Sequence, residues 1–580
     1  MTAVRSSAHA AARKRKDVLT ATLNRRTTMK AAAGLLTSTF LPTGCVAGKQ
    51  DVLSPRLNQV GFRSDAAKRF VLGGSAEQAQ PLTFSIETLD GTRVFEGRVD
   101  TTVHDLTRTT GEHVQVGDFT AFRAPGRYRV RAGSTVSHPF EISDAVYAPV
   151  VRDAARAFYL IRANVGHDDP VTGIRHAAGH LTEARMQVDG TQRDLTGGWY
   201  NAGDYGKWSH MAAMSASCMM WLHELRPHAA RNLVLAVPQT YRGMPDLLQQ
   251  ARWGLEWLLK MQNPDGSVLH KIDANDHFAS GSPEQDTFPR FVYGATSLDA
   301  GNFTGVMLQA ARVFSSFDRG FSGRCRLAAQ RAWQWLQTHP AMLGKDVNYL
   351  DPDPRQEIAW GAFAMAAAAN DAQLAQQATA RLGAVGIFPL SWQAPQLLGA
   401  MSLARSISPA RDAAGEVIAT AAELIVDRVA ADPYGFSANP DDYFWGSNEA
   451  ALYAAVLCLF AAELTLQQRF RATAQRLIDY VLGCNSLDLS FVTGQGQHSV
   501  SRPYHWTFRV WGIVMPGWAS GGANHLPDSV DPLLKALIAR GTPPARCFVD
   551  ACGPDGSWGS NEGQTSENAA LILATGLIGL

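Results

Sequence analysis

The sequence has almost no excess of charge of either sign. Its 580 residues include 53 lysines and arginines against 52 aspartates and glutamates. A chain without a surplus of one sign has no general attraction for nucleic acid or another acidic polymer. The composition therefore favours a neutral substrate, and nucleic acid is not an expected partner.

Cysteine is scarce as well, and its spacing carries no metal-binding pattern. The seven cysteines are scattered, with no C-x-x-C pair, which argues against a disulfide scaffold and a cysteine-rich zinc site. Cys218 and Cys458 lie in apolar helical runs, where free cysteine behaves as a small buried hydrophobe. Cys547 and Cys552 are close enough in sequence to pair, but nothing in the sequence requires that bond.

The apolar run near the N-terminus is too short to cross a bilayer. Residues 31–41 follow the twin-arginine pair Arg25-Arg26, an arrangement typical of a bacterial export signal. The run ends in a segment that resembles a lipoprotein cleavage box at Cys45. We expect residues 1–50 to direct export across the bacterial inner membrane, to the periplasm, the outer membrane or the medium. Cys45 either carries a lipid, the one expected attachment to a membrane, or lies near a simple cleavage point.

The pattern changes from strands to helices near residue 146. Between residues 52 and 145, short alternating segments are separated by turn signals such as Asp90-Gly91, which is typical of a small β-sandwich. From 146 to 580 apolar residues recur at helical spacing, and one helix is expected to begin near Pro245. Long loops rich in glycine, proline and aspartate occupy 263–290 and 483–530. Long loops in a compact domain usually carry function, so we expect them to build the site.

One segment has neither a helical nor a strand period. Residues 197–208 have the sequence GGWYNAGDYGKW, which combines glycines, aromatic rings and a single carboxylate, Asp204. Glycines permit turns and a close approach of a ligand, and tryptophan and tyrosine offer flat apolar faces. The combination suits a sugar-binding loop whose carboxylate activates water.

Several further motifs occur in a fixed order along the chain. They are Asn58-Gln59-Val60-Gly61-Phe62, Asp118-Phe119-Thr120, Pro125-Gly126-Arg127-Tyr128, the 197–208 loop, Pro245-Asp246-Leu247-Leu248, Glu256-Trp257-Leu258-Leu259-Lys260-Met261-Gln262, Tyr443-Phe444-Trp445-Gly446-Ser447-Asn448, Ser490-Phe491-Val492-Thr493-Gly494 and Ser560-Asn561-Glu562. In this order they resemble glycoside hydrolase family 9, in its subgroup with an N-terminal immunoglobulin-like domain. The resemblance runs from about Leu57 to the C-terminus. It implies a mainly α fold: an (α/α)6 toroid over 146–580, with a groove at one end, preceded by an immunoglobulin-like β-sandwich over 52–145.

The resemblance also implies hydrolysis of β-1,4-linked glucans with inversion, without a required cofactor. An inverting glycosidase needs a carboxylate base and a carboxylic acid about 6.5–9.5 Å apart, with room for a water. Asp204 matches the family's base and Glu562 its acid. Taken alone, Asp204 is equally typical of a turn or N-cap, and Glu562 of a helix start.

Aromatic residues in and near these motifs are the expected sugar contacts. Their amphipathic rings suit a sugar cleft, although most tryptophans and tyrosines of any chain belong to its core. The candidates for substrate binding are Trp199, Tyr200, Tyr205, Tyr443, Trp445, Tyr504, His505, Trp506 and Trp558.

The base-bearing loop departs from the family pattern at one position. The family usually has two aspartates here, and Asn201 replaces the first. An amide cannot take up a proton, but it can orient a water by donating and accepting hydrogen bonds. We therefore assign Asn201 to the catalytic group as the residue that orients the water.

A second departure affects the expected sugar contacts beside the cleavage point. Where the family usually has Pro-His-x-Arg, this chain has Tyr504 in place of the histidine and Trp506 in place of the arginine, while His505 stays. Indole cannot imitate the planar fork of a guanidinium. Arg502 or Arg509 would have to supply that group from a shifted loop.

Metal ligands of the family are largely missing. Some relatives bind zinc through cysteines and histidines, but the matching positions here are Ala163 and Gly179, with only His180 kept. A tetrahedral site needs more ligands, so no zinc is expected there. An acidic cluster could hold a structural calcium, although a solvated loop face explains it as well: Asp432, Asp441 and Asp442.

The leading hypothesis is an exported, monomeric hydrolase of cellulose-type polymers or their oligosaccharides. Two alternatives stay open. The altered loops could belong to an exo-acting β-glycosidase on another β-linked sugar, or to a carbohydrate-binding relative that has lost turnover.

Overall fold

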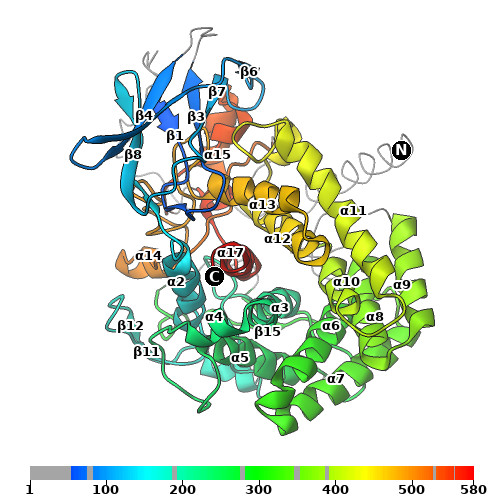
Figure 1. Ribbon diagram of the computed structural model, residues 1–580. Coiled ribbons are helices and arrows are strands. Elements are labelled where there is room, and N and C mark those ends of the chain that lie inside the picture. Colours follow the sequence, from blue (N-terminus) through cyan, green and yellow to red (C-terminus); the bar gives the residue numbers. More distant parts are fainter. Residues whose placement is uncertain are drawn as a thin grey trace.

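The computed structural model describes residues 54–74, 82–185, 193–274, 281–344, 353–385, 391–526, 531–553 and 556–580. The predicted export signal, with Cys45, lies outside the described residues. The described residues form a strand-rich N-terminal part on one side of a ring of helices (Figure 1).

The strands of the N-terminal part form two sheets around an aromatic core. One sheet has the order β1 (Ser54–Arg56), β3 (Arg69–Gly74), β7 (His113–Asp118), β6 (His104–Asp105). The other has the order β2 (Gly61–Phe62), β10 (Phe140–Ile142), β8 (Gly126–Ala132), β4 (Thr83–Thr88), β5 (Arg93–Arg98), with β9 (Thr135–Val136) beside β8. Buried phenylalanines meet edge to face, as in the pair Phe70 and Phe84 at 4.9 Å. The predicted β-sandwich is confirmed, and the turn at Asp90-Gly91 joins β4 to β5.

The rest of the chain forms two concentric layers of helices (Figure 1). The inner helices pack in order around the ring, and the last returns to the first: α3 (Ser209–Leu225), α6 (Ser297–Val313), α8 (Arg355–Ala369), α10 (Gln396–Ala404), α12 (Ser447–Thr465) and α17 (Thr565–Gly579). An outer helix covers each of them in the same order: α5 (Asp246–Met261), α7 (Arg319–Thr338), α9 (Ala372–Val385), α11 (Arg411–Ala430), α13 (Gln468–Val481) and α2 (Ala148–Leu160). This arrangement is the predicted (α/α)6 toroid.

Apolar patterning separates the two layers. The inner helix α3 is buried on nearly all sides, whereas the outer helix α7 buries one face. A helix that is apolar all round belongs inside, and one with a single apolar stripe belongs at the surface of the ring. The outer helix α5 begins directly after Pro245, as predicted, and buries its leucine face against α3.

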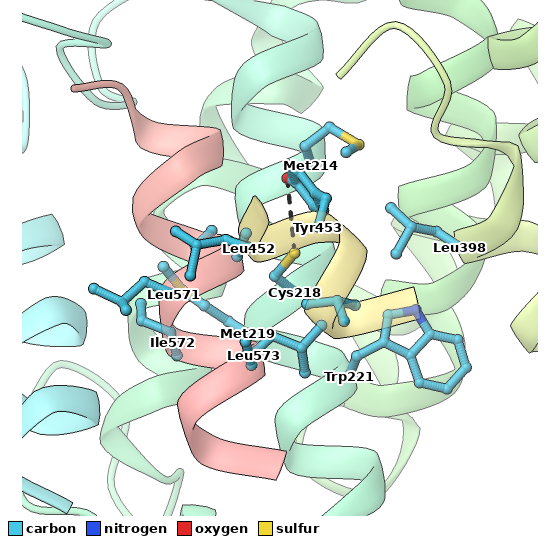
Figure 2. Close-up of a cluster of buried hydrophobic side chains, with 14 of the residues drawn as sticks. Met214, Cys218, Met219, Trp221, Leu398, Leu452, Tyr453, Leu571, Ile572 and Leu573 are labelled. Carbon is cyan, nitrogen blue, oxygen red and sulfur yellow. Dashed lines mark hydrogen bonds between the residues drawn. The ribbon is translucent and has the colours of Figure 1, made fainter. Parts of the chain in front are cut away.

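Large apolar side chains fill the space where α3, α12 and α17 meet. Figure 2 shows Met219, Leu452 and Leu573 converging from these three helices. Cys218 lies among them, with its thiol 4.0 Å from the hydroxyl of Tyr453. This core closes the middle of the ring.

The described cysteines are free. Cys218 and Cys458 are buried, as predicted for small hydrophobes on helices. Cys547 and Cys552 are free as well, so the bond that their spacing would allow is not formed.

Within the described part of the chain, α12 is the one helix long and apolar enough to cross a membrane. Its mean hydropathy is 1.3, and 72% of that window is buried inside the protein. A core helix of a folded domain meets the same criterion.

Asn58 of the sandwich reaches into the toroid. Its Nδ2 donates to Oδ1 of Asp479 in α13 at 2.8 Å and to the hydroxyl of Tyr147 at 3.0 Å. Gln475 donates to the same oxygen of Asp479 at 2.7 Å. Burial raises the pKa of Asp479 to about 7, because a buried carboxylate loses its hydration. Two amide donors thus take over the hydrogen bonds that water would make.

The two long loops contain short elements that the sequence analysis did not predict. Loop 263–290 includes β14 (Lys271–Asp273), which pairs with β13 (Lys207–Trp208) and β15 (Phe291–Val292). Loop 483–530 includes α14 (Trp506–Trp511). The remaining short elements are β11 (His167–Asp168), β12 (Arg175–His176), α4 (Pro227–Asn232), α15 (Pro532–Ala539) and α16 (Trp558–Asn561).

Candidate active site

The loop that carries Asp204 and the side chain of Glu562 meet at one end of the toroid. Asp204 precedes α3 and Glu562 precedes α17, and these two inner helices pack side by side. The backbone N–H of Gly203 donates a hydrogen bond to Oε1 of Glu562 at 3.0 Å. The ring closure therefore brings the Glu562 carboxylate against the loop that carries Asp204.

This close approach requires glycine at position 203. A Cβ atom there would lie 2.9 Å from Oε1 of Glu562 and 2.5 Å from the backbone oxygen of Tyr504. Both distances are below van der Waals contact, so any side chain would push the segments apart.

The partly exposed carboxylate of Asp204 lies near a second acid, Asp273. Oδ1 of Asp204 accepts the N–H of Gly206 at 2.9 Å. A Cβ atom at Gly206 would lie 3.3 Å from that oxygen and 3.4 Å from Oδ1 of Asp273. Asp273 also accepts a hydrogen bond from Lys271 at 3.0 Å. The sequence analysis missed Asp273; its only signal was its place in a long loop expected to be functional.

Asn201 ties the loop to the start of α17. Its backbone N–H donates to the oxygen of Gly206 at 2.8 Å, and its backbone oxygen accepts the N–H of Thr565 at 2.9 Å. Oδ1 of Asn201 accepts the hydroxyl of Thr565 at 2.5 Å. Nδ2 is buried and makes no hydrogen bond to any described residue. The amide oxygen is therefore engaged with the start of α17, while the hydrogen atoms of the amide nitrogen have no acceptor among the described residues.

A buried group of charges holds the base of the loop. Glu183 forms ion pairs with both Lys207 and Arg290. Lys207 also donates to the backbone oxygen of Gly197 at 3.0 Å, and Arg290 to that of Tyr205 at 2.6 Å. Burial lowers the pKa of Lys207 to about 8, against the opposite effect of Glu183. The loop is thus fixed at its start and in its middle before any ligand binds.

Four of the aromatic residues predicted to bind sugar lie in the core instead. They are Trp199, Tyr200, Tyr443 and Trp506, each no more than 3% exposed. Trp199 packs edge-on against Phe158 of α2 at 5.0 Å, and the hydroxyl of Tyr443 donates to the backbone oxygen of Ser437 at 2.8 Å. These predictions are corrected, because a side chain enclosed by protein does not contact a sugar. Spacing along the chain does not distinguish a core ring from a cleft ring.

Tyr205 and His505 are enclosed as well, and they position backbone rather than contact a ligand. The hydroxyl of Tyr205 donates to the backbone oxygen of Gly281 at 2.6 Å. His505 caps the N-terminus of α14, where its Nδ1 accepts the N–H of Thr507 at 3.2 Å. Burial lowers the pKa of His505 to about 3, so the ring is neutral. Their predicted role as direct sugar contacts is corrected in the same way.

Tyr504 lies beside the two carboxylates. Its ring meets that of Trp558 at 6.0 Å, edge to face. Burial raises the pKa of its hydroxyl, and the nearby charges of Glu562 and, more weakly, Asp204 act in the same direction. Only 2% of Tyr504 is exposed, so it forms the wall behind the pair.

Trp445 and Trp558 keep part of their surface exposed. Nε1 of Trp445 donates to the backbone oxygen of Trp558 at 3.1 Å, which joins the two loops. Of the nine residues predicted to bind substrate, these two offer aromatic surface to a ligand.

Of the two arginines considered as replacements, Arg509 is the one at the site. Its Nη2 donates to the backbone oxygen of Gly203 at 2.7 Å, and its guanidinium lies 5.3 Å from the centre of the Tyr504 ring. Arg502 is exposed, and its backbone N–H donates to Asp550 at 2.8 Å.

The predicted calcium cluster does not form a common site. Both carboxylate oxygens of Asp432 accept backbone N–H groups, at 3.0 and 2.9 Å. Asp442 accepts the hydroxyl of Ser437, and Asp441 is exposed. The carboxylates stabilise their own turns, so this expectation is corrected.

His180, the retained position of the zinc site in relatives, takes part in other contacts. Its Nδ1 forms a hydrogen bond with the hydroxyl of Tyr200 at 2.7 Å, and its Nε2 lies 3.8 Å from Asp286. A tyrosine and an aspartate thus surround the single remaining histidine.

Comparison with known proteins matches both parts of the chain. The model of Glycosyl hydrolase family 9 matches residues 147–575, and that of the Cellulase N-terminal ig-like domain matches residues 54–137. A cellodextrinase of Butyrivibrio fibrisolvens is 27% identical over 536 residues, covering 85% of this chain and 94% of its own. A xyloglucan-specific endo-beta-1,4-glucanase of Bacteroides ovatus is 28% identical over 571 residues, covering 90% and 93%.

Solved structures agree with the sequence relatives. A metagenome-derived glycoside hydrolase family 9 endoglucanase superposes with a TM-score of 0.82 at 31% identity, over 91% of this chain and 99% of its own. A zinc-binding triple mutant of the family 9 endoglucanase J30 superposes with a TM-score of 0.82 at 28% identity, over 89% and 99%. Inversion is general for this family. The chain is a glycoside hydrolase and belongs to glycosyl hydrolase family 9.

Proposed function

We propose that this protein cleaves β-1,4-glucosidic bonds with Asp204 as general base and Glu562 as general acid. The observation that carries the assignment is the hydrogen bond of 3.0 Å from the Gly203 N–H to Oε1 of Glu562. This contact supports the assignment because the carboxyl group of Glu562 meets the loop that carries Asp204, and an inverting reaction needs two carboxyl groups with a water between them.

Exposure supports this division of roles. Asp204 is partly exposed, so water can reach it and its charged form stays hydrated. Glu562 is only 9% exposed, and its Oε1 accepts a backbone N–H. The less exposed carboxyl group, Glu562, suits the acid that protonates the leaving oxygen, and the more exposed one, Asp204, suits the base.

Asn201 holds the attacking water in this proposal. Thr565 occupies Oδ1 of Asn201, which leaves Nδ2 as the unused donor of this amide. A water that accepts this hydrogen bond can give its proton to Asp204 and direct a lone pair at the anomeric carbon.

Trp445, Trp558 and Arg509 form the sugar-contacting surface. The two tryptophans are partly exposed, and Arg509 brings a guanidinium to the Tyr504 segment. The substrate is a β-1,4-glucan, as polymer or oligosaccharide. In support, the relatives include a cellodextrinase and a xyloglucan-specific endoglucanase.

Turnover of cello-oligosaccharides tests the assignment. The purified full chain is incubated with cellopentaose, xyloglucan, mixed-linkage glucan and chitosan oligomers, and products are followed by chromatography and proton NMR. We expect cleavage of a glucan with the α-anomer formed first. Glu562→Gln should lower kcat by about a thousandfold or more, whereas Glu256→Gln on the outer helix α5 should leave it unchanged.

Two results would contradict the proposal. Binding of a glucan without turnover would identify a carbohydrate-binding relative. Cleavage of only the terminal unit of another β-linked sugar would identify the exo-acting alternative.

The proposal includes export and a monomeric state. The twin-arginine pair and Cys45 support export, with Cys45 as the lipid attachment point. Cell fractionation of wild type and Cys45→Ala tests the anchor: the variant should leave the membrane fraction. Light scattering of the purified chain should give one chain per particle.

A further inference from the structure

Three buried side chains outside the catalytic pair converge on one point. His210 is in the first turn of α3, His270 directly precedes β14, and Asp299 is in the first turn of α6. They are 0%, 1% and 1% exposed. One candidate ligand atom from each lies within 4.8 Å of the others.

The spacing of His210 and Asp299 fits two ligands on one ion. Nδ1 of His210 lies 3.5 Å from Oδ1 of Asp299. Two ligands bound at about 2.0–2.1 Å in tetrahedral geometry stand about 3.3 Å apart. Oδ1 of Asp299 accepts no hydrogen bond from any described residue. An ion between the two atoms would replace the weak contact of Oδ1 with His210 by two metal–ligand bonds.

The second histidine is oriented toward the same carboxylate. Nδ1 of His270 is 2.6 Å from Oδ2 of Asp299, and the two imidazole rings are parallel within 8° at a centre-to-centre distance of 5.3 Å. An ion would replace the proton shared by His270 and Asp299, and the ring would keep its proton on Nε2. The side chains of His270 and Asp299 would have to move slightly apart from their present distance of 2.6 Å.

Neighbouring groups hold these ligands in place. The hydroxyl of Thr296 donates to Oδ2 of Asp299 at 2.5 Å. The ring of Trp208 meets those of His210 and His270 edge to face, at 6.0 and 5.4 Å. Outer contacts of this kind fix ring orientation and raise metal affinity.

We propose that His210, His270 and Asp299 bind one Zn²⁺ as a structural ion, with a water as fourth ligand. Two imidazoles and one carboxylate suit zinc rather than calcium or magnesium, which prefer sets of oxygen ligands. The ion would join the starts of α3 and α6 to β14. It is distinct from the zinc position of relatives near His180, and it does not depend on the assignment of Asp204 and Glu562.

Zinc titration of the chelator-treated full chain tests the proposal. Calorimetry should give one equivalent of Zn²⁺, and the melting temperature should rise by about 2 °C or more when the site is saturated. Co²⁺ at the same site should give the visible absorption of a four-coordinate ion without a sulfur-to-metal band. These measurements use the wild-type protein and do not depend on the folding of a variant.

Two variants locate the ion. His210→Phe keeps an aromatic ring in the stack and should abolish the equivalent of Zn²⁺. His176→Phe is the matched control, because His176 is also a buried imidazole, stacked on Trp511 at 5.8 Å. It should bind zinc as the wild type does.

Three outcomes would overturn the proposal. The first is an absence of stoichiometric binding, which would leave two imidazoles sharing one carboxylate through protons. The second is equal binding by wild type and a folded His210→Phe. The third is a sulfur-to-cobalt band, which would place the ion on a cysteine.

Discussion

The backbone N–H of Gly203 and Oε1 of Glu562 form a hydrogen bond of 3.0 Å that joins two segments 359 residues apart in the sequence. Gly203 adjoins Asp204, so this contact fixes the position of the proposed acid relative to the loop of the proposed base.

Gly203→Ala should lower kcat by about a hundredfold. The added Cβ would lie 2.9 Å from Oε1 of Glu562, so the carboxylate must move, and a displacement of about 1 Å costs a factor of that order. Steady-state kinetics on the preferred glucan measure the effect. The control is Gly415→Ala in α11, where no atom lies within 4 Å of the added carbon. Activity of Gly203→Ala within twofold of the wild type would contradict the placement of Glu562.

Arg509→Lys should reduce kcat/KM by about tenfold, the value of one charge-assisted hydrogen bond. Lysine keeps the charge but not the planar group that donates to the oxygen of Gly203 at 2.7 Å and lies over the Tyr504 ring. Arg502→Lys, on the exposed part of the same loop, serves as the control and should be neutral. Equal losses in the two variants would mean that Arg509 has no specific place at the site.

Glu449→Gln should remove one component of the pH dependence of stability. Glu449 of α12 accepts Gln564 at 2.7 Å and Ser566 at 2.6 Å, and burial raises its pKa from 4.5 to about 7. The folded protein therefore keeps a proton that the unfolded chain releases above pH 4.5. The stability due to this proton is complete below pH 4.5 and lost as the pH rises to about 7, a change of about 3 kcal/mol.

Urea unfolding of wild type and Glu449→Gln at pH 4.5 and pH 8 measures this component. Glutamine resembles the protonated acid, so the variant should gain stability relative to the wild type at pH 8 and not at pH 4.5. A difference between the proteins that is independent of pH would contradict the raised pKa.

Asp479→Asn should have a parallel effect at the contact between sandwich and toroid. Asparagine still offers Oδ1 to Asn58 and Gln475, but it has no charge to bury. Because the pKa of Asp479 is raised from 3.8 to about 7, the variant should be more stable than the wild type at pH 8, by up to about 4 kcal/mol. The difference should vanish near pH 3.8. Asp412→Asn, at an exposed start of α11, should change little at either pH.

The helical ring could be predicted because its signals are local, whereas the roles of Asp204 and Glu562 come from the resemblance and stay a prediction. The leucine spacing after Pro245 defines the buried face of α5, and the motifs around Asp204 and Glu562 are contiguous in the sequence. Trp199 and Trp506 were assigned to the site because a core ring and a cleft ring have the same local sequence signal. Their packing identifies them as core rings: Trp199 contacts Phe158, and Trp506 contacts Tyr200.

Asp273 illustrates what local patterns miss, because it reaches the site through the pairing of β13 with β14. The choice between Arg502 and Arg509, which the sequence left open, depends on the contact of Arg509 with Gly203. Both contacts join segments far apart in the chain. The sequence likewise shows that Asn201 replaces an aspartate, but it does not show the hydrogen bond between Asn201 and Thr565.

Exchange of parts between this protein and its relatives is limited by the contact of Asn58 with Asp479. A recombinant that took its sandwich from one parent and its toroid from another would have to match these two positions, with Tyr147 and Gln475 between them. A mismatch would leave the buried carboxyl group of Asp479 without the hydrogen bond from Asn58. We therefore expect an active recombinant to take its immunoglobulin-like part and α13 from the same parent, so that the domain boundary near residue 146 is not a free crossover point.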